Sequence, residues 1–160
     1  MNNLNKQRQN IEETVLFEAV NNIEDNISNK KLNTFPNSLI AIGENWHLGV
    51  LGIVASRIKD KYYRPSFVIS DIEGKLTGSA RSISGIDVGK LIIKGVNKKL
   101  LLSGGGHKMA AGFSLNHNTF ESFKDFCDEE VYLQSNSTCL LYTSDAADEG
   151  LGVDLGGRRI

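Results

Sequence analysis

Cysteine, proline and tryptophan are scarce in this chain of 160 residues, which contains two, two and one of them. Cys127 and Cys139 are too few and too isolated to form a disulfide framework or a pattern of metal ligands. No apolar run approaches the roughly eighteen residues of a membrane-spanning helix. The polar start MNNLNKQRQN also lacks the apolar centre of a signal peptide. We therefore expect a cytoplasmic protein with no membrane partner.

A strong net charge is also lacking, since 18 basic and 19 acidic residues leave a net charge of −1. The chain as a whole has no basic signature of a nucleic-acid binder, so a polyanion could be bound only through local placement of charge. Hydrophobic residues make up 40% and charged residues 23% of the chain, which are ordinary values for one globular domain.

The segment at residues 139–160, CLLYTSDAADEGLGVDLGGRRI, resembles the translation of a transposon-type sequencing adapter read in frame. Its acidic residues follow neither a helical nor a strand period, and its glycines interrupt both. We expect this segment to be disordered and the genuine sequence to stop near Thr138. A real acidic, glycine-rich tail is the alternative.

Apolar residues recur every four positions near the N-terminus and predict a helix over residues 4–27: Ile11, Val15, Ala19, Ile23 and Ile27. Turn-forming residues around Pro36 predict a loop after it. Residues 1–37 are thus predicted to be a connecting helix and loop.

Apolar runs and helical periods alternate over residues 38–134. The predicted strands cover residues 38–43, 67–69, 75–82 and 109–115. The predicted helices cover residues 48–63, residues 87–99 after an Asp87 cap, and the chain from a capping box at Asn118 and Glu121 onward. The glycine run before residue 107 is predicted to be a loop. The expected fold class is α/β, with a small mixed sheet flanked by helices in one domain, residues 38–134.

The most pointed feature is a glycine run followed by a histidine, Ser103-Gly104-Gly105-Gly106-His107. Glycines let backbone N–H groups approach a ligand closely, and successive N–H groups in a turn can form an anion-binding nest. His107 adds a donor that can be neutral or charged near neutral pH. The pattern suits a phosphate oxygen, and a flexible turn beside an unrelated histidine explains it equally.

Ser79, Arg81 and Ser82 place hydroxyl groups beside a guanidinium on a predicted strand. Side chains two residues apart share one face of a strand, so Ser79 and Arg81 should point the same way. A guanidinium fork beside hydroxyls is favourable phosphate-binding chemistry. A solvent-facing arginine on an edge strand is the more ordinary interpretation.

Residues 45–50 lie between a predicted strand and a predicted helix, where α/β proteins commonly bind anions. Trp46 could stack on a base, although packing is its more ordinary role, and His47 could contact a ligand or cap the helix. Three lysines add positive charge around the glycine run: Lys98, Lys99 and Lys108. No metal site is predicted, because carboxylates and histidines are not grouped at ligand spacings.

Three segments occur in the order ENWHLGVLGIVASRI, GSARSISGIDV and LLSGGGHKMAAGFSL. Together they resemble the DHH-associated domain of the RecJ exonucleases. The opening LNKQRQNIEE resembles the helix that joins the two halves of that enzyme's core, so the resemblance covers residues 4–133. Leu48 stands where the family more often has proline, which affects helix entry rather than chemistry.

The resemblance implies a parent enzyme that degrades single-stranded DNA from the 5′ end in DNA repair and recombination. Such enzymes use Mn²⁺ or Mg²⁺, whose ligands lie in a preceding DHH domain of the same chain. The DHH-associated domain holds the DNA backbone across a cleft, a role that matches these positions: His47, Ser79, Arg81, Ser82, Gly104, Gly105, Gly106 and His107. No residue is assigned as catalytic, although His107 could contact the transition state.

Two other interpretations stay open. The chain could be a stand-alone nucleic-acid-binding module, or a fragment of a related DHH-family phosphodiesterase that acts on short oligonucleotides or cyclic dinucleotides. The long uncapped helix at residues 4–27 favours a fragment of an enzyme, and the segment GIVASR favours RecJ. The isolated chain is expected to be inactive, because it lacks metal ligands.

Overall fold

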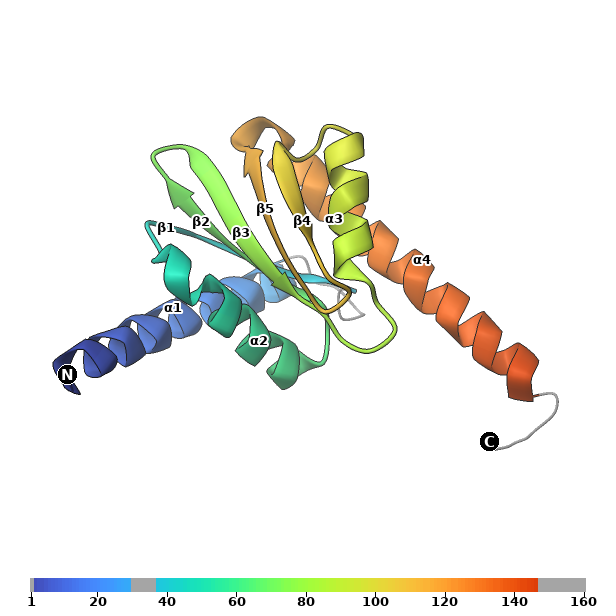
Figure 1. The fold of residues 1–160 in the computed structure, drawn as a ribbon, viewed down its shortest axis with the longest axis horizontal. Helices are drawn as coiled ribbons and strands as arrows, with labels where there is room; N and C mark the ends of the chain where they lie inside the picture. The colour runs from blue at the N-terminus through green and yellow to red at the C-terminus, as the bar shows by residue number, and fades with distance from the viewer. Residues whose placement is uncertain (1, 30–36, 147–160) are drawn as a thin grey trace.

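The computed structural model describes residues 2–29 and 37–146, with side chains described for residues 6–27 and 37–135. Its helices are α1 (Asn2–Asn29), α2 (Leu51–Tyr62), α3 (Val88–Asn97) and α4 (Phe120–Ala146), with short 3₁₀ turns η1 (Leu48–Val50) and η2 (His117–Thr119) before α2 and α4. Its strands are β1 (Leu39–Glu44), β2 (Ser66–Ile72), β3 (Lys75–Arg81), β4 (Ser103–Gly106) and β5 (Ala110–Asn116). Figure 1 shows the sheet between two groups of helices.

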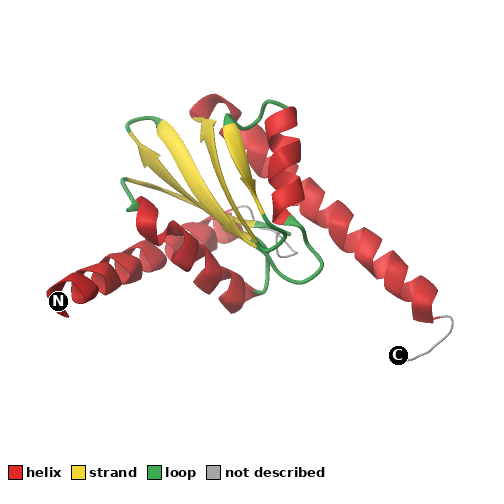
Figure 2. Cartoon of the chain, in the orientation of Figure 1, coloured by secondary structure: helices red, strands yellow, loops and turns green. Residues whose placement is uncertain are grey.

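A five-stranded mixed sheet forms the centre of the fold, in the strand order β1-β2-β3-β5-β4. β1 and β2 are parallel, whereas β2 with β3, β3 with β5, and β5 with β4 are antiparallel pairs. The predicted α/β class with a small mixed sheet is therefore confirmed (Figure 2). None of the helices in the described residues is long and apolar enough to cross a membrane.

Two hydrophobic cores lie on opposite faces of the sheet, because successive side chains of a strand alternate between faces. On β2, Phe67 and Ile69 belong to the core shared with α3 and α4, whereas Val68 belongs to the core shared with α1 and α2. The first core contains three aromatic rings in edge-on or tilted contact: Phe67, Phe113 and Phe123. β2 is thus buried on both faces, which explains its continuous apolar run.

Helix α1 is fastened to the rest of the domain by apolar and polar contacts. Its buried stripe contains three of the residues whose spacing predicted the helix: Val15, Ala19 and Ile23. Asn22 Oδ1 accepts a hydrogen bond from Ile42 N at 3.3 Å, and Glu12 pairs with Arg57 of α2 at 2.7 Å. The predicted connecting helix is therefore packed as part of this domain. The predicted loop after it, residues 30–36, lies outside the described residues.

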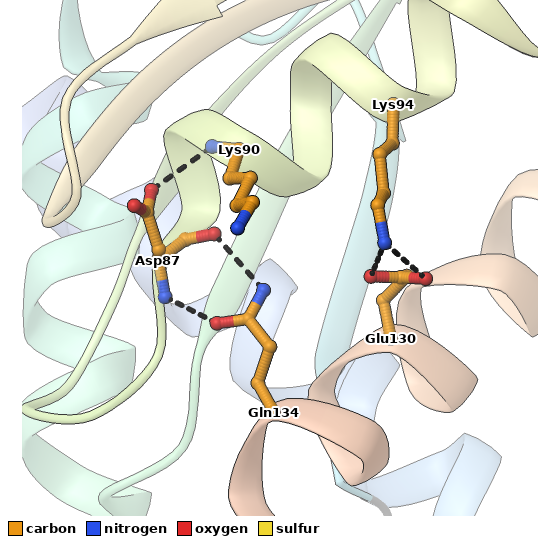
Figure 3. Close-up of polar contacts among 5 residues, drawn as sticks. All are labelled: Asp87, Lys90, Lys94, Glu130 and Gln134. Carbon is orange, nitrogen blue, oxygen red and sulfur yellow. Dashed lines mark hydrogen bonds and ion pairs between the residues drawn. The ribbon is translucent and has the colours of Figure 1, made fainter. Parts of the chain in front are cut away.

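Helices α3 and α4 are joined by the polar contacts of Figure 3. Asp87 caps α3 as predicted, since its carboxylate accepts a hydrogen bond from Lys90 N at 2.9 Å. Asp87 N donates to Gln134 Oε1 at 2.7 Å, and Gln134 Nε2 donates to the Asp87 carbonyl at 3.2 Å. One turn earlier in α4, Glu130 contacts Lys94 Nζ at 3.3 Å. We call these contacts the α3–α4 clamp.

The glycine run is a strand, so the prediction of a loop at Ser103–Gly106 is wrong. These residues pair with β5 and form the edge of the sheet. The lack of a side chain at Gly104 lets the strand lie close to α3, because a Cβ there would come within 2.6 Å of Ile92. An extended strand does not converge its N–H groups, so the predicted anion-binding nest does not form here.

The helix ends also differ from the predictions. Asn118, expected to cap the last helix with Glu121, lies inside η2, where Thr119 instead donates its hydroxyl to the Leu100 carbonyl at 2.8 Å. α4 continues to Ala146, so residues 139–146, expected to be disordered, are helical. Residues 147–160 lie outside the described residues.

Candidate functional site

One half of one sheet face carries polar side chains and glycines. α2 packs over β2 on this face, where Val68 is fully buried. Beyond it lie positions of β3, β5 and β4 that we call the open half-sheet: Thr77, Ser79, Arg81, Ser103, Gly105, Ala110, Gly112 and Ser114. All of them are exposed or half-buried, and a Cβ at Gly105 would meet no atom within 4 Å.

Strand register arranges the open half-sheet in three rows. The rows are Thr77, Ser114 and Ser103; then Ser79, Gly112 and Gly105; then Arg81, Ala110 and the backbone of His107, which is bonded to Ala110. The two serine Oγ atoms of the first row are 2.8 Å apart. The structure therefore brings four of the predicted positions to one surface: Ser79, Arg81, Gly105 and His107.

Arg81 supplies the positive charge of this surface. Its Nη1 donates to the Ala80 carbonyl at 2.8 Å, and its guanidinium lies against Gly52 in the first turn of α2. No ion pair with Arg81 is formed by the acidic side chains that the structure describes. The remaining guanidinium donors are thus not neutralised by a carboxylate of this region.

Ser82 is placed differently from its two predicted partners. It is buried, and its Oγ donates to the Ile86 carbonyl at 2.7 Å, with a longer contact to the Ile83 carbonyl at 3.3 Å. Its backbone N donates to Met109 O at 2.9 Å, which ties the end of β3 to the β4–β5 hairpin. The hydroxyl of Ser82 is therefore committed to the turn and does not reach the open half-sheet.

His107 is exposed at the end of β4. The backbone N of His107 donates to Ala110 O at 2.6 Å. The carbonyl of the next residue, Lys108, accepts a hydrogen bond from Val88 N at 3.0 Å. A Cβ at Gly89 would lie 2.7 Å from His107 O, so position 89 must be glycine for the start of α3 to pack against the hairpin. The hairpin that carries His107 is thus fixed against α3.

His47 caps η1, since its Nδ1 accepts a hydrogen bond from Gly49 N at 3.0 Å, and its ring is exposed. Trp46 packs in the α1–α2 core, where it is 5% exposed and its Nε1 donates to Glu18 at 2.9 Å. The structure shows the packing role for Trp46. It shows the capping role for His47 through Nδ1 and leaves the ring exposed. A buried indole is unavailable for stacking on a base.

Sequence reasoning missed the hydroxyls of Thr77, Ser103 and Ser114 and the backbone space at Gly112. Each is a single polar or small residue on a strand. Such a residue alone does not indicate a binding site. The signal that joins them is the pairing of β3 with β5 and of β5 with β4, and strand register requires the folded sheet.

A family model described as the DHHA1 domain matches residues 9–132. The chain belongs to the DHHA1 domain family. This DHHA1 domain is 37% identical over 134 residues to the single-stranded-DNA-specific exonuclease RecJ of Haemophilus influenzae, covering 82% of this chain and 23% of that protein. It is 35% identical over 131 residues to RecJ of Escherichia coli, covering 80% and 22%. The chain spans less than a quarter of the length of these curated relatives.

Solved structures agree with this assignment. RecJ of Thermus thermophilus in complex with Mn²⁺ matches with a TM-score of 0.66 and 30% identity, over 82% of this chain and 18% of that one. The C-Ala domain of Aquifex aeolicus alanyl-tRNA synthetase shares the fold alone, with a TM-score of 0.51 and 16% identity, over 62% of this chain and 96% of that one. The resemblance to RecJ drawn from the three motifs is confirmed.

We searched the described part of this DHHA1 domain for side chains that could hold a divalent metal. Within residues 2–29 and 37–146, no group of three or more His, Cys, Asp or Glu side chains could hold an ion. His117 is paired with Asp71 at 2.8 Å, and the other oxygen of Asp71 accepts from Gly74 N at 3.0 Å in the β2–β3 turn.

Proposed function

We propose that this DHHA1 domain is the substrate-binding part of a RecJ-like 5′–3′ exonuclease and holds the phosphate backbone of single-stranded DNA on the open half-sheet. The observation that supports this role is the set of three rows, in which Arg81 and several hydroxyls share a surface with bare backbone. No acidic residue occurs in β3, β4 or β5. Hydroxyls and a guanidinium fork are donors for phosphate oxygens, and contacts to phosphates hold a nucleic acid without reading its sequence.

Each residue of the proposed phosphate-binding surface has a different chemical role. Arg81 supplies a forked charge, and the hydroxyl of Ser79 supplies a neutral donor two residues away on the same face. Gly105 and Gly112 let a phosphate come close to the sheet, because neither has a side chain in the way. Gly104 and Gly106 allow the strand itself to lie close to its neighbours. His107 at the end of β4 and His47 before η1 are exposed imidazoles, with donors that would suit oxygen acceptors.

Local charge supports binding of a polyanion, although the whole chain is close to neutral. Between Asp87 and Glu121 the sequence has no acidic residue and five lysines: Lys90, Lys94, Lys98, Lys99 and Lys108. The α3–β4–β5 stretch is therefore basic in sequence, and within it Lys94 is paired with Glu130 of α4 at 3.3 Å. Such asymmetry steers a nucleic acid to one side of a protein.

The chemistry of the parent enzyme belongs to a separate domain in this proposal. The Thermus thermophilus relative was solved in complex with Mn²⁺ and in complex with Mg²⁺. We propose the same class of ion in the parent of this chain, held by a DHH domain that faces the open half-sheet. The ion would supply an activated water for phosphodiester hydrolysis. The parent enzyme would use this reaction in DNA repair and recombination.

The test is binding of fluorescein-labelled oligo(dT) to the chain, followed by anisotropy over a range of salt concentrations. Arg81→Ala should weaken binding of oligo(dT) and of a mixed sequence by similar factors, and should flatten the salt slope by about 0.7, the value of one single-strand phosphate contact. Arg57→Ala is the matched control, because Arg57 pairs with Glu12 on the α1 side. An altered sequence preference with an unchanged slope would refute the phosphate role.

A further inference from the structure

Strand β3 carries a continuous line of polar side chains on the face of the open half-sheet. Side chains two residues apart share a face of a strand, so Lys75 lies on the same face as the alternate residues of β3 up to Arg81. Lys75 is exposed, and its register partner on β5 is Asn116, which is also exposed. Lys75 and Asn116 therefore form a fourth row, next to the row of three hydroxyls and at the opposite end of the open half-sheet from Arg81.

Most polar side-chain groups of this line are not used inside the domain. Within the part of the chain whose side chains are described, those of Lys75, Thr77 and Ser79 form no hydrogen bond or ion pair. Ser103 and Ser114 share one hydrogen bond between their Oγ atoms at 2.8 Å, so one of these two hydroxyls keeps its proton free. The row of hydroxyls therefore still offers two donors, one from threonine and one from a serine.

Cations stand at both ends of the line, and neutral groups lie between them. Lys75 begins β3 and Arg81 ends it, whereas the rows between them contain hydroxyls and glycines. Asp71 of β2, which lies across from Leu76, is paired with His117 at 2.8 Å. A linear polyanion that runs along β3 thus meets a cation at each end and hydroxyl donors between them. A polyanion that crosses the strands meets only the lysine or only the arginine.

The spacing of the rows matches the repeat of an extended nucleic-acid strand. Successive rows are two residues apart, which corresponds to about 6.7 Å along a β-strand. A nucleotide adds about twice as many bonds to its backbone as an amino-acid residue does, so one extended nucleotide spans about two residues. The rows from Arg81 to Lys75 therefore offer one position to each of about four successive nucleotides.

We propose that single-stranded DNA lies along β3, with one nucleotide at each row from Arg81 to Lys75. The row of hydroxyls is then a neutral phosphate subsite, and Lys75 with Asn116 holds the phosphate at the far end. The bare backbone of Gly105 and Gly112 leaves room for the DNA between the two ends. This inference rests on the proposed binding of DNA to the open half-sheet, and it adds the direction of the strand and the residues at its far end.

Substitutions distinguish the charged row from the neutral one. Lys75→Ala should weaken binding of fluorescein-labelled oligo(dT) and flatten the salt slope by about 0.7, because one charged contact to a phosphate is lost. Thr77→Val combined with Ser114→Ala should weaken binding about fivefold at an unchanged slope, because hydroxyls release no counterions. Lys6→Ala on α1 and Ser122→Ala on α4 are the matched controls, since both side chains are exposed on helices outside the open half-sheet. Unchanged melting temperatures show that the variants fold.

Spin labels at the ends of the DNA test its direction. Oligo(dT) of about four nucleotides, the length of the rows, carries a nitroxide at its 5′ end or at its 3′ end. Broadening of the amide signals of the ¹⁵N-labelled chain is followed by NMR. The two labels should broaden signals at opposite ends of β3, one near Lys75 and the other near Arg81. A strand that crosses the sheet would place one label at α2 and the other at β4.

The outcomes separate this inference from the DNA-binding proposal on which it rests. Suppose that Arg81→Ala weakens binding while Lys75→Ala or the double hydroxyl variant has no effect. The path along β3 is then wrong, and the DNA-binding proposal stands. Broadening at α2 and β4 would lead to the same conclusion. Absence of oligo(dT) binding, or full affinity in Arg81→Ala, would overturn both.

Discussion

At the scale of single residues, the position of Arg81 depends on the missing side chain of Gly52. The guanidinium lies so close to this glycine that a Cβ would collide with Nη2. The colliding atom is the end of a flexible side chain, so a methyl group would move the guanidinium while leaving the backbone in place. Gly52 therefore leaves free the space in which the Arg81 guanidinium lies.

Gly52→Ala should reduce oligo(dT) affinity and flatten the salt slope as Arg81→Ala does, by about 0.7. The melting temperature should stay unchanged or rise, because alanine is favoured over glycine in a helix by roughly 1 kcal/mol. Ser56→Ala on the same helix is the control and should leave binding unchanged. A large fall in melting temperature, or an unchanged salt slope, would contradict the positioning role.

Tyr62 makes stability depend on alkaline pH. Its burial, with the hydrogen bond to Glu24 at 2.8 Å and the charge of that carboxylate, raises the pKa of Tyr62 from 10.0 to about 12. The folded state thus keeps the phenol proton where the unfolded state loses it. Stability from this group is full below about pH 10 and is lost as pH rises through about 12.

Tyr62→Phe should therefore reduce the loss of unfolding free energy between about pH 10 and pH 12, measured by urea denaturation. Tyr63→Phe removes a neighbouring hydroxyl from a side chain that is 61% exposed, and should leave the pH dependence as in the unmodified chain. Identical pH profiles for Tyr62→Phe and the unmodified chain would show that folding does not raise the pKa of Tyr62.

At the scale of elements, Trp46 fixes the junction between β1 and α2. Its ring packs on the bare backbone of Gly43, and its carbonyl accepts a hydrogen bond from Ser70 Oγ at 2.7 Å. Gly43→Ala should destabilise the domain by about 1–3 kcal/mol through overpacking. The emission of Trp46, the sole tryptophan, should shift to longer wavelength. Gly105→Ala is the matched control, since a Cβ there meets no atom within 4 Å.

Elements with a strong local pattern could be predicted from the sequence, and elements fixed by tertiary contacts could not. The stripe of α1, the apolar run of β2 and the Asp87 cap are local signals, and the structure has all three. β4 was missed because glycine has little strand preference of its own, and its extended form depends on α3 and β5. Capping by Asn118 failed for a related reason, since Thr119 and Leu100 fix the start of α4.

The candidate site was predictable where chemistry alone identifies a residue. Ser79 and Arg81 share a face because of the period of a strand, which the sequence contains. The burial of Ser82 depends on the turn to Ile86, and the row of Thr77, Ser114 and Ser103 depends on register. The burial of Ser82 and the row of hydroxyls do not follow from residue type. They could therefore not be predicted without the folded structure.

At the scale of the whole molecule, the proposal divides binding and chemistry between domains. The purified chain should release no nucleotides from single-stranded DNA with Mn²⁺ or Mg²⁺, because its described residues form no metal site. The measurement is release of acid-soluble label after repeated purification, with a RecJ enzyme as positive control. Metal-dependent release that stays with the chain through purification would place catalytic groups in this domain.

Shortening the chain within helix α4 shows where the folded domain ends. Its buried side chains reach as far as Val131, and the α3–α4 clamp reaches Gln134, within the part whose side chains are described. A chain shortened to residues 1–138 keeps all of these contacts, so its melting temperature should equal that of the full chain. A chain shortened to residues 1–129 loses Val131 and both clamp residues of α4, Glu130 and Gln134.

The shorter truncation should melt several degrees lower, since each 1 kcal/mol is worth about 3–6 °C for a domain of this size. The lost terms are burial of an aliphatic side chain and hydrogen bonds to the cap of α3, each worth about 1 kcal/mol or more. A fall of several degrees in the 1–138 chain would show that residues after Thr138 pack on the domain. The helix that continues to Ala146 would then be a selected part of the fold, and the interpretation of residues 139–160 as translated adapter would fail with it.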